Sequence, residues 1–442
     1  MQLSSEMMAA EGPAKTELKR TPDETEEDSK RCKTELPEND TKPSDIVKPL
    51  KNDENNGQSK DSNGSTEAKD ETKIAYPTKK KYAIMMGFCG DGYRGMALNV
   101  GVNTIEEELI TALLKCQFIK PENAREMGKM YFQRASRTDK GVSAARQVVS
   151  SNLNLGPDLK AAVSQLNEAL PDNITVYDII KATKHFDSHK FASSRVYEYN
   201  CPSFAMAPTL GDTWSGYRIT PQVLAKVREF LQNFVGTKNY YNYTSNKSAS
   251  DPSCFRYIRS ISVSDPVIVE DIEYIRIFLH GDSFIYHQIR KITGMTIAVM
   301  RNVTPSDHLE KSFTKDRVDI PLAPGLGLVL DEVKMERYNK KFGKDGCHTP
   351  LVWDPYEEQV QDFKMKHILS VIHRKEKAES IMFNWLQTLK KHKFYTGDVL
   401  PEILTGQSGE SKGADISDSG EKKDSTTTES AVSLESSTNA AK

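Results

Sequence analysis

Between residues 82 and 333 the sequence repeats one order of secondary-structure elements, and this repeat constrains the fold more than any other feature. The first copy has strand-like runs at 82–89, 129–135, 146–153 and 174–180, with helical patterns at 104–116 and 158–170. The second copy has strand-like runs at 195–200, 256–263, 273–279 and 327–333, with helical patterns at 220–236 and 284–300. Both copies therefore have the order strand–helix–strand–strand–helix–strand, which is that of a ferredoxin-like unit.

Local signals support these elements. Thr104 precedes the acidic run Glu106-Glu107-Glu108, which is typical of a capped helix with an acidic first turn. Thr220-Pro221 opens a helix that Gly236 ends. We predict an α+β fold in which two ferredoxin-like β-α-β-β-α-β halves form one broad, mainly antiparallel sheet with helices on its back. The other face, or the seam between the halves, would then hold a long ligand.

Composition separates a folded middle from two polar ends. Residues 1–76 and 401–442 contain almost no aromatic residues, so they cannot bury enough apolar surface to offset chain entropy, and we predict that both are disordered. The other expected domains are 77–190 and 191–350 for the two halves and 351–400 for a helical extension. The whole chain carries a net charge of −2 and the two ends carry −6 and −4, which leaves +8 on the middle. A basic core favours a polyanionic partner such as nucleic acid.

Within the predicted extension, residues 357–390 have apolar residues at helical spacing. These residues are Phe363, Met365, Ile368, Val371, Ile372, Met382, Trp385 and Leu386. Packing against the core is one explanation for this segment. Its basic residues leave open a contact with RNA. They are Lys364, Lys366, Arg374, Lys375 and Lys377.

Other patterns bear on the compartment. The six cysteines form no Cys-x-x-Cys pair, which indicates free thiols in a reducing intracellular environment and no zinc site. No long apolar run indicates a membrane span or a secretory signal, so we expect no membrane partner. Lys19-Arg20 and Lys30-Arg31-Cys32-Lys33 resemble a two-part nuclear-import signal. We predict a nuclear protein and leave open an additional mitochondrial pool.

The stretch from Arg134 to Gln147 places a single carboxylate, Asp139, in a turn between two strands and among basic residues. The basic residues are Arg134, Arg137, Lys140 and Arg146. An Asp in a Thr-Asp-Lys-Gly turn commonly hydrogen-bonds its own backbone, and Lys-Gly is ordinary in hairpins. The alternative is a catalytic carboxylate in a phosphate-binding cleft, kept ionised by guanidinium groups. The local sequence alone leaves both interpretations open.

Further motifs occur in a fixed order around this turn. They are Tyr93-Arg94-Gly95-Met96, Phe132-Gln133-Arg134, Arg137-Thr138-Asp139-Lys140-Gly141-Val142, Arg195-Val196-Tyr197-Glu198-Tyr199, Phe234-Val235-Gly236-Thr237-Lys238-Asn239-Tyr240, Phe284-Ile285-Tyr286-His287-Gln288-Ile289-Arg290-Lys291 and Ala323-Pro324-Gly325-Leu326-Gly327-Leu328. With these motifs, which span roughly residues 82–350, the chain resembles the TruA-class pseudouridine synthases, and most closely the eukaryotic Pus1-type enzymes. Arg-Thr-Asp alone would be a weak match, whereas the ordered set is specific. Ser143 stands where bacterial relatives often have His.

The resemblance implies an RNA isomerase that breaks the bond between ribose C1′ and uracil N1, rotates the base and rejoins it through C5. The product is an isomer, so no metal, redox cofactor or activated donor is implied. The family's catalytic carboxylate corresponds to Asp139, which either attacks the ribose or removes a ribose proton. Arg290 corresponds to the partner of this carboxylate across the seam. Tyr197 corresponds to a tyrosine that stacks on the uracil and can accept the C5 proton.

The resemblance also implies how RNA is held. Arg137 would contact the target phosphate or fill the gap left by the flipped-out base. The other expected RNA contacts are Arg134, Lys140, Arg146, Tyr93 and Arg195. The expected partners are tRNA and other structured RNAs such as mRNA, selected by shape.

Two rival functions use the same residues. A non-catalytic RNA-binding or RNA-folding protein could use the same basic cleft, but absence of Asp139 would be its signature, and Asp139 is present. A base-releasing glycosidase with a carboxylate nucleophile would release free uracil instead of an isomer. We expect no obligate protein partner, and either a monomer or a homodimer.

Overall fold

The structure is a computed structural model that describes residues 76–209 and 216–394. The chain divides into Met1–Thr72 and Lys73–Lys442, and every described residue belongs to the second unit. The two expected tails, except for Tyr76, therefore lie outside the described residues, as do both basic clusters of the expected import signal. The boundaries proposed for the two halves stay a prediction.

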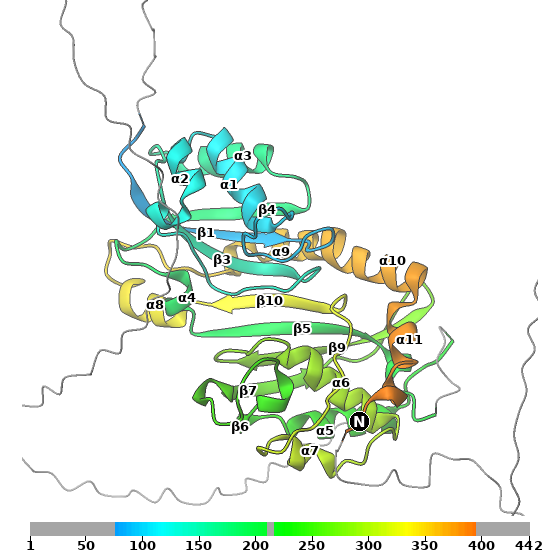
Figure 1. The fold of residues 1–442 in the computed structure, drawn as a ribbon. Coiled ribbons are helices and arrows are strands. Elements are labelled where there is room, and N and C mark those ends of the chain that lie inside the picture. Colours follow the sequence, from blue (N-terminus) through cyan, green and yellow to red (C-terminus); the bar gives the residue numbers. More distant parts are fainter. Residues whose placement is uncertain (1–75, 210–215, 395–442) are drawn as a thin grey trace, which may run out of the picture. The chain divides into compact units, whose positions relative to one another are not determined.

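Ten strands of the described residues form one sheet (Figure 1). They are β1 (Lys80–Phe88), β2 (Gln133–Arg134), β3 (Ser143–Leu153), β4 (Ile174–Lys181), β5 (Ser194–Pro202), β6 (Gly236–Asn239), β7 (Phe255–Val263), β8 (Val267–Val269), β9 (Ile272–Gly281) and β10 (Leu328–Lys334). The spatial order is β4-β1-β3-β10-β5-β9-β7-β6, with β2 beside β3 and β8 beside β9. The sheet is antiparallel throughout except where β3 and β10 run parallel.

The two halves have the same internal order of strands. In the first half β1 lies between β4 and β3, and in the second half β5 lies between β10 and β9. The halves join where Ser143 of β3 pairs with Val329 of β10 and Ala144 pairs with Leu330. This arrangement confirms the predicted α+β fold with one broad, mainly antiparallel sheet.

Helices connect the strands and extend beyond them. The α-helices of the described residues are α1 (Ile105–Lys115), α2 (Pro121–Arg125), α3 (Leu159–Ala169), α4 (Ser188–Phe191), α5 (Pro221–Gln232), α6 (Gln288–Met300), α7 (His308–Ser312), α8 (Glu336–Phe342), α9 (Glu357–Phe363), α10 (Ser370–Glu379) and α11 (Ile381–Leu386). A π-helix, η6 (Lys364–Leu369), joins α9 to α10, so the predicted helical character of 357–390 is confirmed. Among the described helices, none is long and apolar enough to cross a bilayer.

The helix starts follow the capping signals of the sequence. The Thr104 hydroxyl accepts a hydrogen bond from the Glu107 backbone amide, and the Thr220 hydroxyl accepts one from the Val223 amide. Each bond satisfies an amide that has no partner inside its helix. The two helices therefore begin within a residue or two of the predicted positions.

Two predicted elements are shorter than expected. The strand expected at 129–135 is reduced to β2, because a 3₁₀ turn at Met127–Met130 ends in the left-handed residue Tyr131, with φ at 48°. The helix expected from residue 284 begins only at Gln288, because His287 is also left-handed, with φ at 69°. Neither residue is glycine, and side chains with a Cβ seldom adopt this conformation. A sequence pattern gives no warning of such an interruption.

The two faces of the sheet have different neighbours near the seam. Tyr197 of β5 lines a cavity, whereas the next residue, Glu198, pairs with Lys364 of η6. Successive residues of a strand point to opposite faces, so the C-terminal helices cover the face opposite to the cavity. Figure 1 shows α1, α2 and α3 near β1 and β4 at one end of the sheet, and α5, α6 and α7 at the other end. The cavity lies over the seam.

Candidate active site

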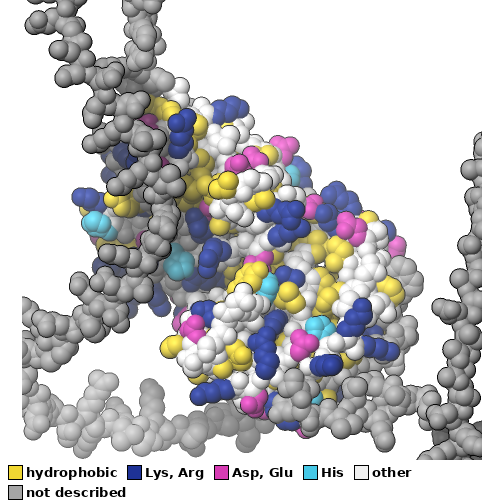
Figure 2. Space-filling model, viewed as in Figure 1, with side chains coloured by type: hydrophobic (Ala, Val, Ile, Leu, Met, Phe, Trp, Pro, Cys, Tyr) yellow, Lys and Arg dark blue, Asp and Glu magenta, His cyan; other side chains and the backbone are white. Residues whose placement is uncertain are grey.

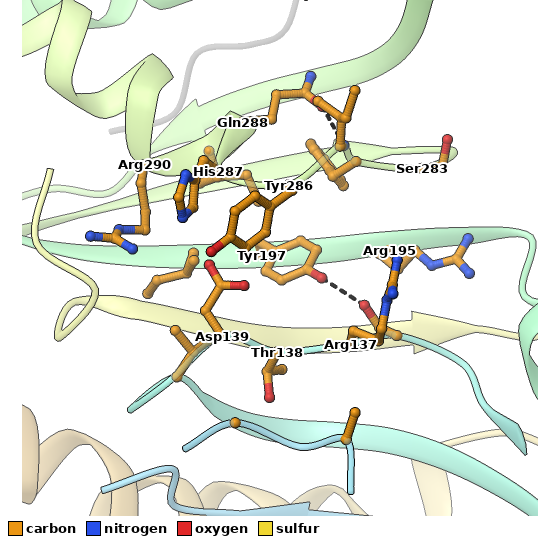
Figure 3. A pocket seen from close by; sticks show the side chains of 18 of the residues that line it. Arg137, Thr138, Asp139, Arg195, Tyr197, Ser283, Tyr286, His287, Gln288 and Arg290 are labelled. Carbon is orange, nitrogen blue, oxygen red and sulfur yellow. Dashed lines mark hydrogen bonds between the residues drawn. The ribbon is translucent and has the colours of Figure 1, made fainter. Parts of the chain in front are cut away.

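A cavity of about 530 Å³ lies where the two halves meet (Figure 3). Its lining includes Arg94, Gly95, Leu98, Ser136, Arg137, Thr138, Asp139 and Val142 from the first half and Arg195, Tyr197, Phe284, Tyr286, His287, Gln288, Arg290 and Leu328 from the second. The structure therefore brings together Asp139, Tyr197, Arg290, Arg137 and Arg195, which lie up to 153 positions apart in the sequence. Arg137 and Asp139, like Arg195 and Tyr197, are two positions apart, but the approach of these two pairs to each other and to Arg290 does not follow from sequence spacing.

Backbone contacts hold the loop that carries Asp139. The Val142 amide donates to the Asp139 carbonyl at 3.1 Å, and the Gly141 amide donates to the Tyr93 carbonyl at 3.2 Å. Gly95, with φ at 111°, packs so closely that an added Cβ would lie 2.9 Å from the Thr138 carbonyl oxygen. The Tyr93-Arg94-Gly95-Met96 motif therefore packs against the Asp139 loop and holds it in place, and this close contact requires glycine at position 95.

The Asp139 side chain is half-buried, and burial raises the pKa of its carboxyl group. The positive charges of Arg290 and Arg137 act in the opposite direction and lower that pKa. Asp139 nevertheless forms no ion pair within 4.0 Å with any residue that the structure describes. The direct Asp139–Arg290 pair expected from the resemblance is thus absent, and the two groups interact across a gap.

Arg290 is fixed by the segment that precedes β10. Its Nε donates to the Ala323 carbonyl at 2.7 Å, and the Ala323 amide donates back to the Arg290 carbonyl at 3.2 Å. Gly294, one helical turn further, lies against the Pro321 carbonyl, where an added Cβ would be 2.1 Å from the oxygen. The motif that begins at Ala323 therefore positions Arg290, and this explains why the two motifs occur together.

Tyr197 connects the halves inside the cavity. Its hydroxyl lies 2.7 Å from the Ser136 hydroxyl of the first half, and its ring packs edge-on against Phe284 of the second half. Burial raises the pKa of Tyr197, and the nearby Asp139 adds to this rise, whereas the bond to Ser136 and the charge of Arg195 lower it. The hydroxyl is therefore protonated at neutral pH.

Of the remaining sequence-predicted residues, Arg137 and Arg195 line the cavity, whereas Lys140 and Tyr93 do not. Arg137 is exposed and lines the cavity. Arg195 also lines it, but its guanidinium donates to the carbonyls of Asp282 and Ala135 at 2.9 and 2.8 Å and is 8% exposed, so it holds the seam together. Lys140 is exposed but does not line the cavity, and Tyr93 is buried behind the Asp139 loop.

Two predicted phosphate contacts, Arg134 and Arg146, form ion pairs within the protein and do not line the cavity. Arg146 lies on the opposite face of the sheet, where it is 6% exposed and pairs with Glu357 at 2.7 Å and Asp331 at 3.5 Å. Arg134 pairs with Glu106 of α1 and does not line the cavity. Arg146 therefore lies away from the cavity, with its charge paired to protein carboxylates, and its contact with RNA stays a prediction.

Sequence reasoning assigned no role to Tyr286, His287 or Gln288, which lie just before Arg290. Burial, with further effects of Arg290 and Lys291, lowers the pKa of His287 to about 4, so the imidazole is neutral. Its Nδ1 is buried without a hydrogen-bond partner among the described residues. These residues lie within one of the motifs that carry the resemblance, and the ring-rich run before Arg290 was the available signal.

Comparisons with known proteins identify the family of this chain. Residues 230–336 match the family model described as tRNA pseudouridine synthase. The mouse protein Pseudouridylate synthase 1 homolog is 38% identical over 344 residues, which cover 75% of this chain and 81% of the relative. The human protein of the same name is 39% identical over 339 residues, covering 74% and 79%. The tRNA pseudouridine synthase 1 of Yarrowia lipolytica is 30% identical over 415 residues, covering 74% and 77%. The chain therefore belongs to the tRNA pseudouridine synthase family, whose enzymes isomerise uridine in RNA.

Proposed function

We propose that this chain isomerises uridines of tRNA, and of other structured RNAs including mRNA, with Asp139 as the catalytic carboxylate. The observation that carries the proposal is the half-buried Asp139 carboxylate, which has no ion-pair partner among residues 76–209 and 216–394 and lies in a cavity that also contains Tyr197 and Arg290. A charge left without a partner in a cleft is characteristic of a functional group. Burial raises the pKa of this carboxyl group, and the positive charges of Arg290 and Arg137 oppose that rise and favour the ionised form.

The chemistry requires an ionised carboxylate by either of two routes. In the first, Asp139 attacks C1′, the uracil leaves with the electron pair of the C1′–N1 bond, and the resulting ester is displaced when C5 attacks C1′. In the second, Asp139 removes a ribose proton as the base leaves and returns it after C5 has added. In both routes C5 loses its proton and N1 gains one, so the product is an isomer of the substrate.

Tyr197 is the proposed group for the last proton transfer. A neutral hydroxyl can accept the C5 proton if it passes its own proton on, and the Ser136 hydroxyl, 2.7 Å away at the cavity, can relay that proton by releasing its own to water in the cavity. Arg137 is exposed at the cavity and is the proposed contact for the target phosphate. Figure 2 shows Lys and Arg side chains over both halves of the viewed face, which suits a phosphate backbone.

Product analysis on a defined RNA tests the proposal. A tRNA transcript incubated with wild-type protein should contain pseudouridine and keep its mass, and Asp139→Ala should give none while RNA binding survives. Free uracil in the supernatant would identify the rival glycosidase. RNA binding by the wild type without any isomer would identify the rival non-catalytic function.

The nuclear location is also a proposal, and it depends on residues outside the described parts. The basic clusters Lys19-Arg20 and Lys30-Arg31-Cys32-Lys33 are the proposed import signal. Replacing the five basic residues of these clusters with alanine should move a fluorescent fusion from the nucleus to the cytosol. Unchanged localisation would exclude the clusters as the signal.

A further inference from the structure

An exposed tyrosine stands at the mouth of the cavity. Tyr286, in the turn before α6, lines the cavity and is 57% exposed, whereas Tyr197 of β5 also lines it and is 7% exposed. Figure 3 shows Tyr286 and His287 reaching toward Asp139, which points toward them from the other half. A single exposed tyrosine is ordinary on a protein surface, so the argument depends on how this one is held.

The backbone beside Tyr286 is fixed although its ring is exposed. The Gln288 side-chain oxygen accepts from the Ile285 amide at 2.9 Å, and the Gln288 amide donates to the Ile285 carbonyl at 3.1 Å. His287 between them is left-handed, with φ at 69°. Strained conformations of this kind persist where the surrounding structure enforces them, and they cluster at functional sites.

The turn stacks one ring on another. The ring centroids of Tyr286 and His287 are 3.6 Å apart, with an angle of 27° between the planes. His287 therefore supports one face of Tyr286, and its neutral imidazole adds no charge beside Arg290. The strained backbone of His287 thus holds the Tyr286 ring in position near the Asp139 carboxylate.

The reaction supplies a use for such a ring, and this step rests on the proposed function. Between bond cleavage and rejoining, the detached uracil must turn so that C5 takes the place of N1. Hydrogen bonds fix the direction of a base, whereas stacking holds its face and tolerates any in-plane orientation. A base held by stacking can turn without leaving the cavity.

We propose that Tyr286, supported by His287, is the surface on which the extruded target uracil stacks, opposite the wall that contains Tyr197. Tyr286 acts as a binding and positioning residue for the base and does not take part in proton transfer. Stacking of one base on an aromatic side chain contributes about 1–3 kcal/mol by alanine substitution, which corresponds to about 5- to 150-fold in affinity.

The test separates the base from the rest of the RNA. A tRNA transcript whose target uridine has been mapped with the wild-type enzyme is prepared with that uridine or with an abasic site at the same position. Affinities are measured in an Asp139→Asn background, so that no turnover occurs. Tyr286→Ala should weaken binding of the uridine RNA by about 5- to 150-fold more than binding of the abasic RNA. Tyr286→Phe should keep the wild-type preference for the uridine RNA.

The control is Tyr257→Ala, because Tyr257 is also an exposed tyrosine, at 46%, but does not line the cavity. It should leave both affinities unchanged. Equal losses on the two RNAs for Tyr286→Ala, or no loss on either, would overturn the stacking role. The mapping step itself tests the proposed function separately, because a wild-type enzyme that forms no pseudouridine there would refute that function, whereas the affinity comparison tests only Tyr286.

Discussion

The two faces of the sheet at β5 differ in whether the charged side chains named here form ion pairs with other described residues. On the cavity face, Asp139 is half-buried and has no ion pair within 4.0 Å among the described residues. On the opposite face, Lys364 pairs with both Glu198 and Asp331, and Arg146 pairs with Asp331. Buried charges that serve stability are paired, whereas a charge without a partner is available to a substrate. Near β5, the buried charges named on the face opposite to the cavity are thus paired within the protein, whereas the Asp139 carboxylate is left available to a substrate.

The largest effect on activity is expected from replacing Asp139 on the cavity face, and the same replacement of Asp331 on the opposite face is its control. Asp139→Asn should reduce pseudouridine formation by about 10²–10⁴-fold or more, because it removes the reacting carboxylate. Its unfolding free energy should stay within about 0.5 kcal/mol of the wild type or rise, because a partly desolvated charge is removed. Activity of the folded fraction and urea denaturation measure both quantities.

The matched control is Asp331→Asn, which makes the same aspartate-to-asparagine replacement on the opposite face of the sheet. It should lower stability, because Lys364 and Arg146 lose a common partner, and it should leave the turnover of folded enzyme nearly unchanged. Stability loss without activity loss at Asp139, or the reverse at Asp331, would contradict the division between the faces.

The next effect concerns the anchor of the C-terminal helices. Lys364→Ala should lower the free energy of unfolding by about 3–5 kcal/mol, because it leaves the fully buried Glu198 without a counter-charge. The double variant Glu198→Gln with Lys364→Met should recover most of that loss, since no buried charge then lacks a partner. Denaturant titration of the three proteins measures the pattern, and a double variant as unstable as Lys364→Ala would argue against a charge effect.

The same division shows what the sequence could reveal. The doubled element order predicted the sheet, and the resemblance pointed to Asp139, Tyr197 and Arg290, which the structure brings to one cavity. Local charge density grouped Arg146 with the Asp139 loop, but it does not say to which face of the sheet a strand residue points, and Arg146 lies on the face opposite to the cavity. Its partner Glu357 lies 211 positions away, in a segment whose docking no local pattern predicts.

His287 shows a second limit. Its left-handed backbone depends on the turn formed by Ile285 and Gln288 and on the segment before β10, which holds Arg290. Sequence periodicity continued the helix through this residue. The turn beside His287 closes through the Gln288 side chain, and the neighbouring Arg290 is held by Ala323, so hydrophobic periodicity does not reveal this conformation.

A smaller effect is expected at Arg290, which acts on Asp139 across a gap. Arg290→Ala should reduce activity by about 10- to 150-fold, the range of a lost interaction of about 1.5–3 kcal/mol with a charged group. Because Arg290 lowers the pKa of Asp139, its loss raises that pKa further. The carboxylate then ionises only at higher pH, so the acidic limb of the pH–rate profile should shift to higher pH. A profile with an unmoved acidic limb would show that Arg290 acts only through structure.

Arg290→Lys sharpens this point. A lysine keeps the positive charge but cannot reproduce the guanidinium fork that donates through Nε to the Ala323 carbonyl. The acidic limb should therefore return toward the wild-type position while the maximal rate stays low. Since Asp139 and Arg290 are not in direct contact, a double-mutant cycle on stability should give a coupling energy well below the value of a buried pair.

The smallest expected effect lies at the Tyr197–Ser136 contact, which crosses the seam on the cavity face. Ser136→Ala should lower the free energy of unfolding by about 0.5–1.5 kcal/mol, because the buried Tyr197 hydroxyl loses its partner at 2.7 Å. Tyr197→Phe should have a similar effect on stability, and the double variant should cost little more than either single one. Activity distinguishes the structural role from the chemical one. If the Tyr197 hydroxyl accepts the C5 proton, Tyr197→Phe slows turnover far more than Ser136→Ala, and the slow step shows an isotope effect with 5-deuterouridine RNA. Equal and small activity losses in the two variants, without that isotope effect, would reduce Tyr197 to a wall of the cavity and leave Asp139 as the sole reacting side chain on this face.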